Sequence, residues 1–106
     1  MTRILIILLA TVLIGCGITQ RGAITRAYSA IGEGRYDAAL ARLSEAEGYL
    51  EPTPELRAEI TFLRARSYEG LQRTSDAVAL HRYLVATFPE SSYGYQARER
   101  LKQLEK

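Results

Sequence analysis

The sequence lacks tryptophan and holds only one cysteine, one histidine and three prolines among its 106 residues. A lone cysteine cannot form an internal disulfide, and one histidine without a cysteine cluster excludes the usual structural zinc sites. An excess of one charge is also missing, because 14 basic residues face 12 acidic ones and the formal charge is +2. That balance is unlike the strongly basic surface of a nucleic-acid-binding protein. The length allows one small domain.

A single long apolar run lies at the N-terminus, from Ile4 to Ile14. It follows Arg3, and small residues flank Cys16 directly after it, which is the layout of a secretory signal. A membrane-spanning helix needs roughly 20 apolar residues, so the run is too short for a comfortable span. An uncleaved short anchor with an inert cysteine is the alternative that the pattern leaves open.

The four residues Leu13-Ile14-Gly15-Cys16 resemble the lipobox of bacterial lipoprotein signal peptides. The resemblance implies that Cys16 receives a diacylglycerol group, that the signal peptide 1–15 is cleaved, and that the new amino terminus is acylated, for example with palmitate. Two or more acyl chains anchor a protein stably, whereas one binds only marginally. Gly17 replaces the aspartate that typically retains such proteins at the inner membrane. The implied location is therefore the bacterial outer membrane, lipid-anchored and facing the periplasm.

Residues 16–22 comprise Cys16 and a short tether. The domain that follows, residues 23–106, shows helical periodicity. Apolar residues recur three and four positions apart, as in amphipathic helices, and convincing period-two alternation is missing. We therefore expect an all-α fold. Five helices are expected, with the inner-face residues Ala23, Ala27, Ala30 and Ile31, then Tyr36, Ala39, Leu40, Leu43 and Ala46, then Ile60, Leu63, Ala65, Tyr68 and Leu71, then Ala77, Leu80, Leu84 and Val85, and finally Tyr93, Ala97, Leu101 and Leu104.

Glycine, proline and capping residues predict where these helices begin and end. Gly32 and Gly34 separate the first two helices. Pro54 suits the first turn of the third helix. Ser75-Asp76 is predicted to cap the fourth, and Phe88-Pro89 to end it.

A repeat is visible in the spacing of four alanines. Ala27 precedes Ala39 by twelve residues, Ala65 precedes Ala77 by the same twelve, and the two pairs are 38 residues apart. Each pair places small side chains where facing helices approach closely. Self-similarity at a fixed period is typical of solenoids, whose units cannot bury their apolar faces alone. We expect an α-solenoid fragment.

The segment Ala65–Pro89, which contains Tyr68 and Ala77, resembles a tetratricopeptide (TPR) repeat of about 34 residues. The segment Ala27–Ala46 resembles a preceding repeat. The resemblance implies about two TPR-like helix hairpins followed by a C-terminal capping helix. Tyr83–Ser91 also resembles the repeat ends of bacterial outer-membrane assembly lipoproteins and of their periplasmic cell-division relatives.

In TPR arrays the first helix of each pair lines a concave groove. Carried over through the matched positions, the resemblance places these candidate partner-binding residues there: Ile24, Tyr28, Ile31, Glu59, Phe62, Arg66 and Glu69. Tyrosine and arginine are the residue types enriched at interface hot spots. The alternative is that Tyr28, Ile31 and Phe62 fill a small core.

Groups for catalysis are few in this chain. A nucleophile needs a base beside it, and His81 is the only histidine. Its place between Leu80 and Arg82 on a predicted helix indicates a partly exposed side chain. Glu55 and Glu59 share a helix face, but acidic residues are expected in an opening turn because they favour the helix dipole. We therefore expect no enzyme, with no catalytic residues, no metal and no cofactor.

Together the resemblances imply a membrane-anchored periplasmic TPR adaptor lipoprotein that binds another envelope protein. It would support assembly of an outer-membrane, secretion or cell-wall complex. The alternative is a structural accessory subunit that uses its convex face, or a pilotin-like assembly factor of a secretion or pilus system. The sequence alone does not choose between them.

The lipid-anchor hypothesis predicts the behaviour of a Cys16→Ser variant. Serine cannot form the thioether, so we expect an uncleaved precursor without acyl mass. Intact-mass spectrometry of membrane fractions from cells expressing either form measures this. A normally processed Cys16→Ser protein contradicts the hypothesis.

Overall fold

The computed structural model describes residues 20–49 and 51–106, which form an all-α fold of helical hairpins. The signal segment 1–15 and Cys16, on which the lipid-anchor prediction rests, lie outside the described residues. A first helix covers residues 20–32. It is followed by α2 (Tyr36–Tyr49), α3 (Pro54–Gly70), α4 (Thr74–Thr87) and α5 (Ser92–Leu104). Within the described ranges, no helix is long and apolar enough to cross a membrane.

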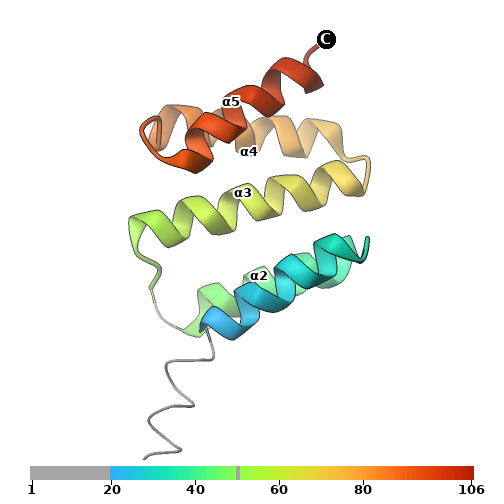
Figure 1. Cartoon of the computed structure of the whole chain (residues 1–106), viewed down its shortest axis with the longest axis vertical. Coiled ribbons are helices and arrows are strands. Elements are labelled where there is room, and N and C mark those ends of the chain that lie inside the picture. The colour runs from blue at the N-terminus through green and yellow to red at the C-terminus, as the bar shows by residue number, and fades with distance from the viewer. Residues whose placement is uncertain (1–19, 50) are drawn as a thin grey trace, which may run out of the picture.

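The helices lie in two layers. The first helix, α3 and α5 form the front layer in Figure 1, and α2 and α4 lie behind them. The central element is α3, which packs against α2, α4 and α5. This arrangement confirms the all-α, solenoid-like fold that the sequence predicts.

Local signals set most of the helix boundaries. Thr53 caps α3, because its side chain accepts a hydrogen bond from the Leu56 amide at 3.2 Å, and Pro54 occupies the first turn as predicted. Gly34 adopts a φ of +75° in the turn before α2, a conformation that glycine reaches without steric cost. Ser91 caps α5 in the same manner as Thr53 caps α3.

The predicted cap of α4 was wrong. The helix begins at Thr74, with Arg73 at the N-cap position and no side-chain cap hydrogen bond. Asp76 lies inside the first turn and pairs with Arg73 Nε at 2.8 Å. A carboxylate in a first turn favours the helix dipole, so Asp76 stabilises this end without capping it.

Small residues allow the helices to approach closely. All four alanines of the twelve-residue spacing, at 27, 39, 65 and 77, are fully buried. Every residue expected on an inner face is buried or half-buried, although Leu71 lies just beyond the end of α3. The larger core cluster, between the first helix, α2 and α3, contains Ala23, Ile24, Ala27, Leu43, Ala46, Ile60 and Leu63.

A second core cluster joins α3, α4 and α5 and is thinner. Its fully buried members are Ala58, Leu84 and Ala97. Aromatic rings, among them Phe62 and Tyr93, pack against it from the side. Because its buried aliphatic side chains are few, this half of the protein depends more on close backbone contact and on polar interactions.

Gly94 provides one such close contact at the start of α5. A Cβ at this position would lie 1.9 Å from the carbonyl oxygen of Phe88. We expect Gly94→Ala to push α5 away from the end of α4 and to lower the free energy of unfolding by about 1–3 kcal/mol. Urea denaturation followed by circular dichroism measures this.

Gly48→Ala is the matched control, because its Cβ would meet no atom within 4 Å. This helical position should gain about 0.5–1 kcal/mol from the higher helix propensity of alanine. Equal effects of the two substitutions would contradict the close-contact explanation.

Candidate functional site

Two open pockets lie along the front layer, each lined by the first helix, α3 and α5, and together we call them the groove. It has two halves, each lined from all three helices. The polar half has a volume of about 620 Å³. It is lined by Gln20, Arg21, Ile24, Thr53, Glu55, Leu56, Glu59, Glu90, Ser91, Ser92 and Tyr93.

The apolar half of the groove has a volume of about 500 Å³ and lies over the middle of α3. It is lined by Tyr28, Ile31, Phe62, Leu63, Arg66, Tyr95, Gln96, Glu99 and Arg100. Tyr28 and Tyr95, which come from opposite walls, expose 46% and 61% of their surfaces. Aromatic side chains that stay exposed inside a concave surface are available for contact with a partner.

A polar bridge joins residues that line the polar half of the groove. The buried Glu59 of α3 accepts a hydrogen bond from Arg21 Nη1 at 2.9 Å and another from the Tyr93 hydroxyl at 3.0 Å. Tyr28 of the first helix interacts electrostatically with Tyr93 and Glu59. One carboxylate thus connects the first helix, α3 and α5, because a buried charge must be paired.

The tyrosines of this bridge stay protonated at neutral pH. Burial raises the pKa of the Tyr93 hydroxyl, and the neighbouring Tyr28 and Glu59 raise it further. Burial also raises the pKa of Tyr28, and the neighbouring Tyr93 offsets only part of that increase. Both hydroxyls therefore remain donors, and the bridge persists at neutral pH.

A second carboxylate on α3, that of Glu69, joins α4 and α5. Its Oε1 accepts hydrogen bonds from Arg100 Nε, at 3.1 Å, and from Arg100 Nη2. Arg66 Nη1 reaches the same oxygen at 3.5 Å, and Oε2 lies 2.9 Å from His81 Nε2. Burial opposes ionisation of Glu69, but the Arg100, His81 and Arg66 interactions outweigh it and hold the pKa of this carboxyl below its ordinary value.

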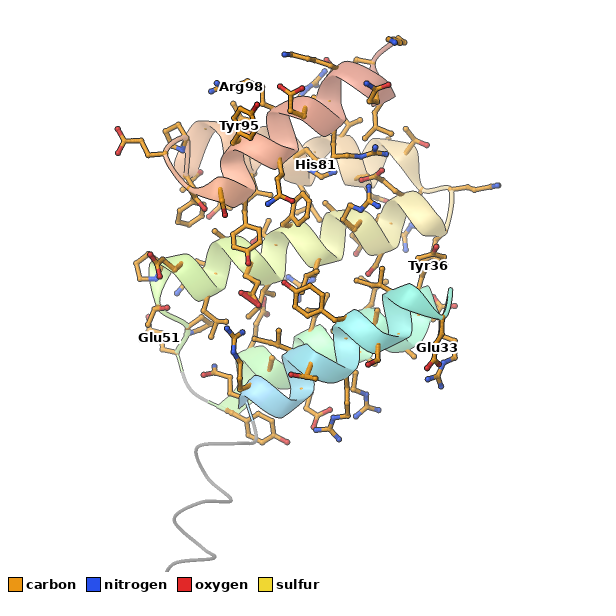
Figure 2. All side chains as sticks on the ribbon, viewed as in Figure 1. Glu33, Tyr36, Glu51, His81, Tyr95 and Arg98 are labelled. Atoms are coloured by element: carbon orange, nitrogen blue, oxygen red, sulfur yellow. The ribbon has the colours of Figure 1, made fainter. Side chains whose placement is uncertain are left out.

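His81 is fully buried, so the expectation of a partly exposed side chain was wrong. The ring lies where α3, α4 and α5 meet (Figure 2), with its centroid 5.8 Å from that of Phe62. The spacing held a signal for this placement, because His81 follows the buried Ala77 by four residues and precedes the buried Leu84 by three. Those intervals put all three on one helix face.

Burial lowers the pKa of the His81 imidazole, and the nearby Arg100 and Arg66 lower it further, against the opposing effect of Glu69. The ring is therefore neutral at pH 7. We assign its proton to Nε2, which donates to Glu69. Nδ1 is buried and finds no hydrogen-bond partner in the part of the chain that the structure describes.

The groove gathers most of the predicted partner-binding residues. Tyr28, Ile31, Phe62 and Arg66 line the apolar half. Ile24 and Glu59 line the polar half, but the structure places Ile24 almost entirely in the larger core cluster. Glu69 lies beneath the apolar half, where its oxygens pair with Arg66, Arg100 and His81.

The sequence reasoning missed the contribution of α5 to the groove. Tyr95 and Arg100 come from this helix. A signal was present, because α5 begins at Ser92, 38 residues after α3 begins at Pro54. The 38-residue period therefore predicts that both helices occupy equivalent places in the front layer.

Among residues 20–49 and 51–106, no three histidine, cysteine, aspartate or glutamate side chains gather in a way that could hold a metal ion. The chain matches no protein-family model, and no curated protein or solved structure is significantly similar to it.

The burial of His81 predicts a pH dependence of stability. An unfolded chain protonates this ring near the ordinary pKa of 6.5, whereas the native state protonates it only at lower pH. Unfolding therefore becomes easier as the pH falls from 6.5 to the native pKa, by at most about 1.4 kcal/mol per pH unit for one proton. Urea denaturation at several pH values measures this, and the single imidazole signal in proton NMR reports the native pKa directly.

His81→Gln is the matched control, because the glutamine amide can still donate to Glu69 but does not titrate. In this variant the free energy of unfolding should depend less on pH just below pH 6.5. The variant should still lose stability below pH 4.5. In that range Glu69 becomes protonated more readily in the unfolded chain than in the native state. Identical profiles for the two proteins would contradict the assignment.

Proposed function

We propose that this protein is a membrane-anchored, periplasm-facing adaptor lipoprotein with TPR-like repeats. Its groove docks a segment of another envelope protein and so supports assembly of an outer-membrane, secretion or cell-wall complex. The observation that carries the proposal is the open groove over α3, lined by Tyr28, Phe62, Arg66 and Tyr95. In this proposal the protein binds a partner and catalyses no reaction.

The groove is suited to docking because its walls are already fixed. Glu59 ties the first helix and α5 to α3, and Glu69 ties α5 and α4 to it. Because the side chains of a preformed site are already ordered, little conformational entropy is lost when a partner binds. The exposed Tyr28 and Tyr95 offer large contact areas with few rotatable bonds.

The proposed anchor supports a tethering role. The first described helix residue, Gln20, is only four residues after Cys16. If Cys16 is lipidated, that distance is at most about 14 Å of extended chain. A partner segment docked in the groove would therefore be held close to the lipid surface.

A second candidate function uses the back layer. Tyr49 on α2 and Tyr83 on α4 each expose 45% of their surfaces. An accessory subunit or pilotin-like factor could bury these rings against a larger complex without using the groove. The two candidates differ in which layer meets the partner.

Site-specific photo-crosslinking in intact cells distinguishes the layers. A photoreactive phenylalanine analogue replaces Tyr95 in the groove or Tyr83 in the back layer, in the full chain. We expect a defined adduct with an envelope protein from position 95 and none from position 83, scored by mass shift and peptide identification. The two positions are matched, because both hold exposed tyrosines.

An adduct from position 83 alone would contradict the groove adaptor and support the accessory subunit. No protein adduct from either position would contradict both candidates.

A further inference from the structure

The two halves of the groove carry opposite charge. In the polar half, Arg21 faces Glu55, Glu59 and Glu90, so acidic groups are in excess. Both Glu55 and Glu90 are exposed. The apolar half contains two guanidinium groups over one buried carboxylate, and its cations are therefore in excess.

Glu99 does not cancel this excess in the apolar half. It also lines that half, but its carboxylate pairs with Lys102 at 3.0 Å. His81 is neutral, so it adds no charge beside Glu69. Lys102 lies outside the lining, so two cations, Arg66 and Arg100, face one anion, Glu99, among the lining residues of the apolar half.

Arg66 is the cation that uses fewer of its N–H donors within the protein. Arg100 directs two N–H groups at Glu69, whereas Arg66 reaches the same carboxylate only through Nη1, at 3.5 Å. Within the described residues that is its only ion pair, and 40% of its side chain is exposed. A guanidinium has five N–H donors, and their fork geometry matches a second, planar carboxylate.

The surroundings of Arg66 strengthen such a contact. Phe62, Tyr28 and Ile31 line the same half of the groove. Apolar neighbours displace water when a partner docks, and a charge-assisted hydrogen bond is stronger where water is excluded. A volume of about 500 Å³ is within the range of ligand pockets and accommodates an apolar side chain beside the guanidinium.

We infer that the groove recognises a protein segment in which an apolar side chain, seated against Phe62, is accompanied by an acidic side chain that pairs with Arg66. The acidic polar half selects a basic residue elsewhere in the same segment, which fixes the direction in which the segment lies. This inference rests on the proposed docking function and specifies the chemistry of its partner.

Selection from a phage-displayed library of random peptides tests the charge rule. The full chain is immobilised in lipid nanodiscs, and the peptides retained by the wild type, Arg66→Glu and Arg98→Glu are sequenced. Arg98→Glu is the matched control, because this arginine lies on α5 outside the groove lining and its reversal changes the net charge equally (Figure 2).

We expect the wild type and Arg98→Glu to enrich peptides in which aspartate or glutamate accompanies an aromatic or aliphatic residue. Arg66→Glu should instead enrich lysine or arginine at that place. One charge-assisted pair corresponds to about a tenfold change in affinity, which sets the size of the expected preference. Equal acidic enrichment on the wild type and Arg66→Glu, or no enriched sequence on the wild type, would overturn the inference.

Arg66→Gln covers the case in which the glutamate variant does not fold. Glutamine removes the charge without placing a second carboxylate beside Glu69, and it should lose the acidic preference without gaining a basic one. Thermal unfolding followed by circular dichroism shows which variants are folded. An acidic preference that persists in a folded Arg66→Gln protein overturns the inference.

The crosslinking experiment separates this inference from the proposed function. An adduct from position 95, together with an acidic peptide preference that is the same with and without Arg66, would support the adaptor function but contradict the charge rule. The absence of both adduct and preference removes the two together.

Discussion

The arrangement of the helices depends on two carboxylates of α3, Glu59 and Glu69, that are withdrawn from water. A buried charge costs several kcal/mol unless partners satisfy it. Glu59 obtains its partners from the first helix and α5, and Glu69 obtains them from α3 itself, α4 and α5. The first helix, α4 and α5 can therefore pack on α3 only where their donors reach these oxygens. This constraint matters most at the thin core cluster of Ala58, Leu84 and Ala97, where apolar packing alone specifies little.

The same two networks shape the groove. Tyr93 and Arg21 both donate to Glu59, and all three line the polar half. Arg100 donates to Glu69 and lines the apolar half. Polar links of this kind add less stability than apolar packing of equal volume, but they restrict which surfaces can meet. The groove is thus a consequence of how the front layer is held together, and its shape is present before any partner arrives.

Local patterns predicted the fold well because they act over one helical turn or one repeat. The alanines at 27, 39, 65 and 77, the first helical turn at Pro54 and the turn at Gly34 all depend on neighbours close in sequence or on a fixed period. The site was predicted only in part. Arg21 and Glu59 are 38 residues apart, and Arg100 and Glu69 are 31 apart, so no local spacing reveals these pairs. The spacing of His81 from Ala77 and Leu84 did indicate a buried position, but its partner Glu69 lies on another helix and is not revealed by that spacing.

In the proposed docking function, the pairing at Glu69 allows partner binding and stability to be separated in so small a domain. When a groove residue is the only partner of a buried charge, it cannot turn toward another protein without leaving that charge unpaired. Here Arg100 supplies two hydrogen bonds to Oε1 and His81 supplies one to Oε2, so the long contact from Arg66 is not needed to satisfy the carboxylate. Arg66 can therefore turn toward a ligand while the helix packing stays intact. The redundancy of cations around one carboxylate leaves a charged side chain available in the apolar half of the groove.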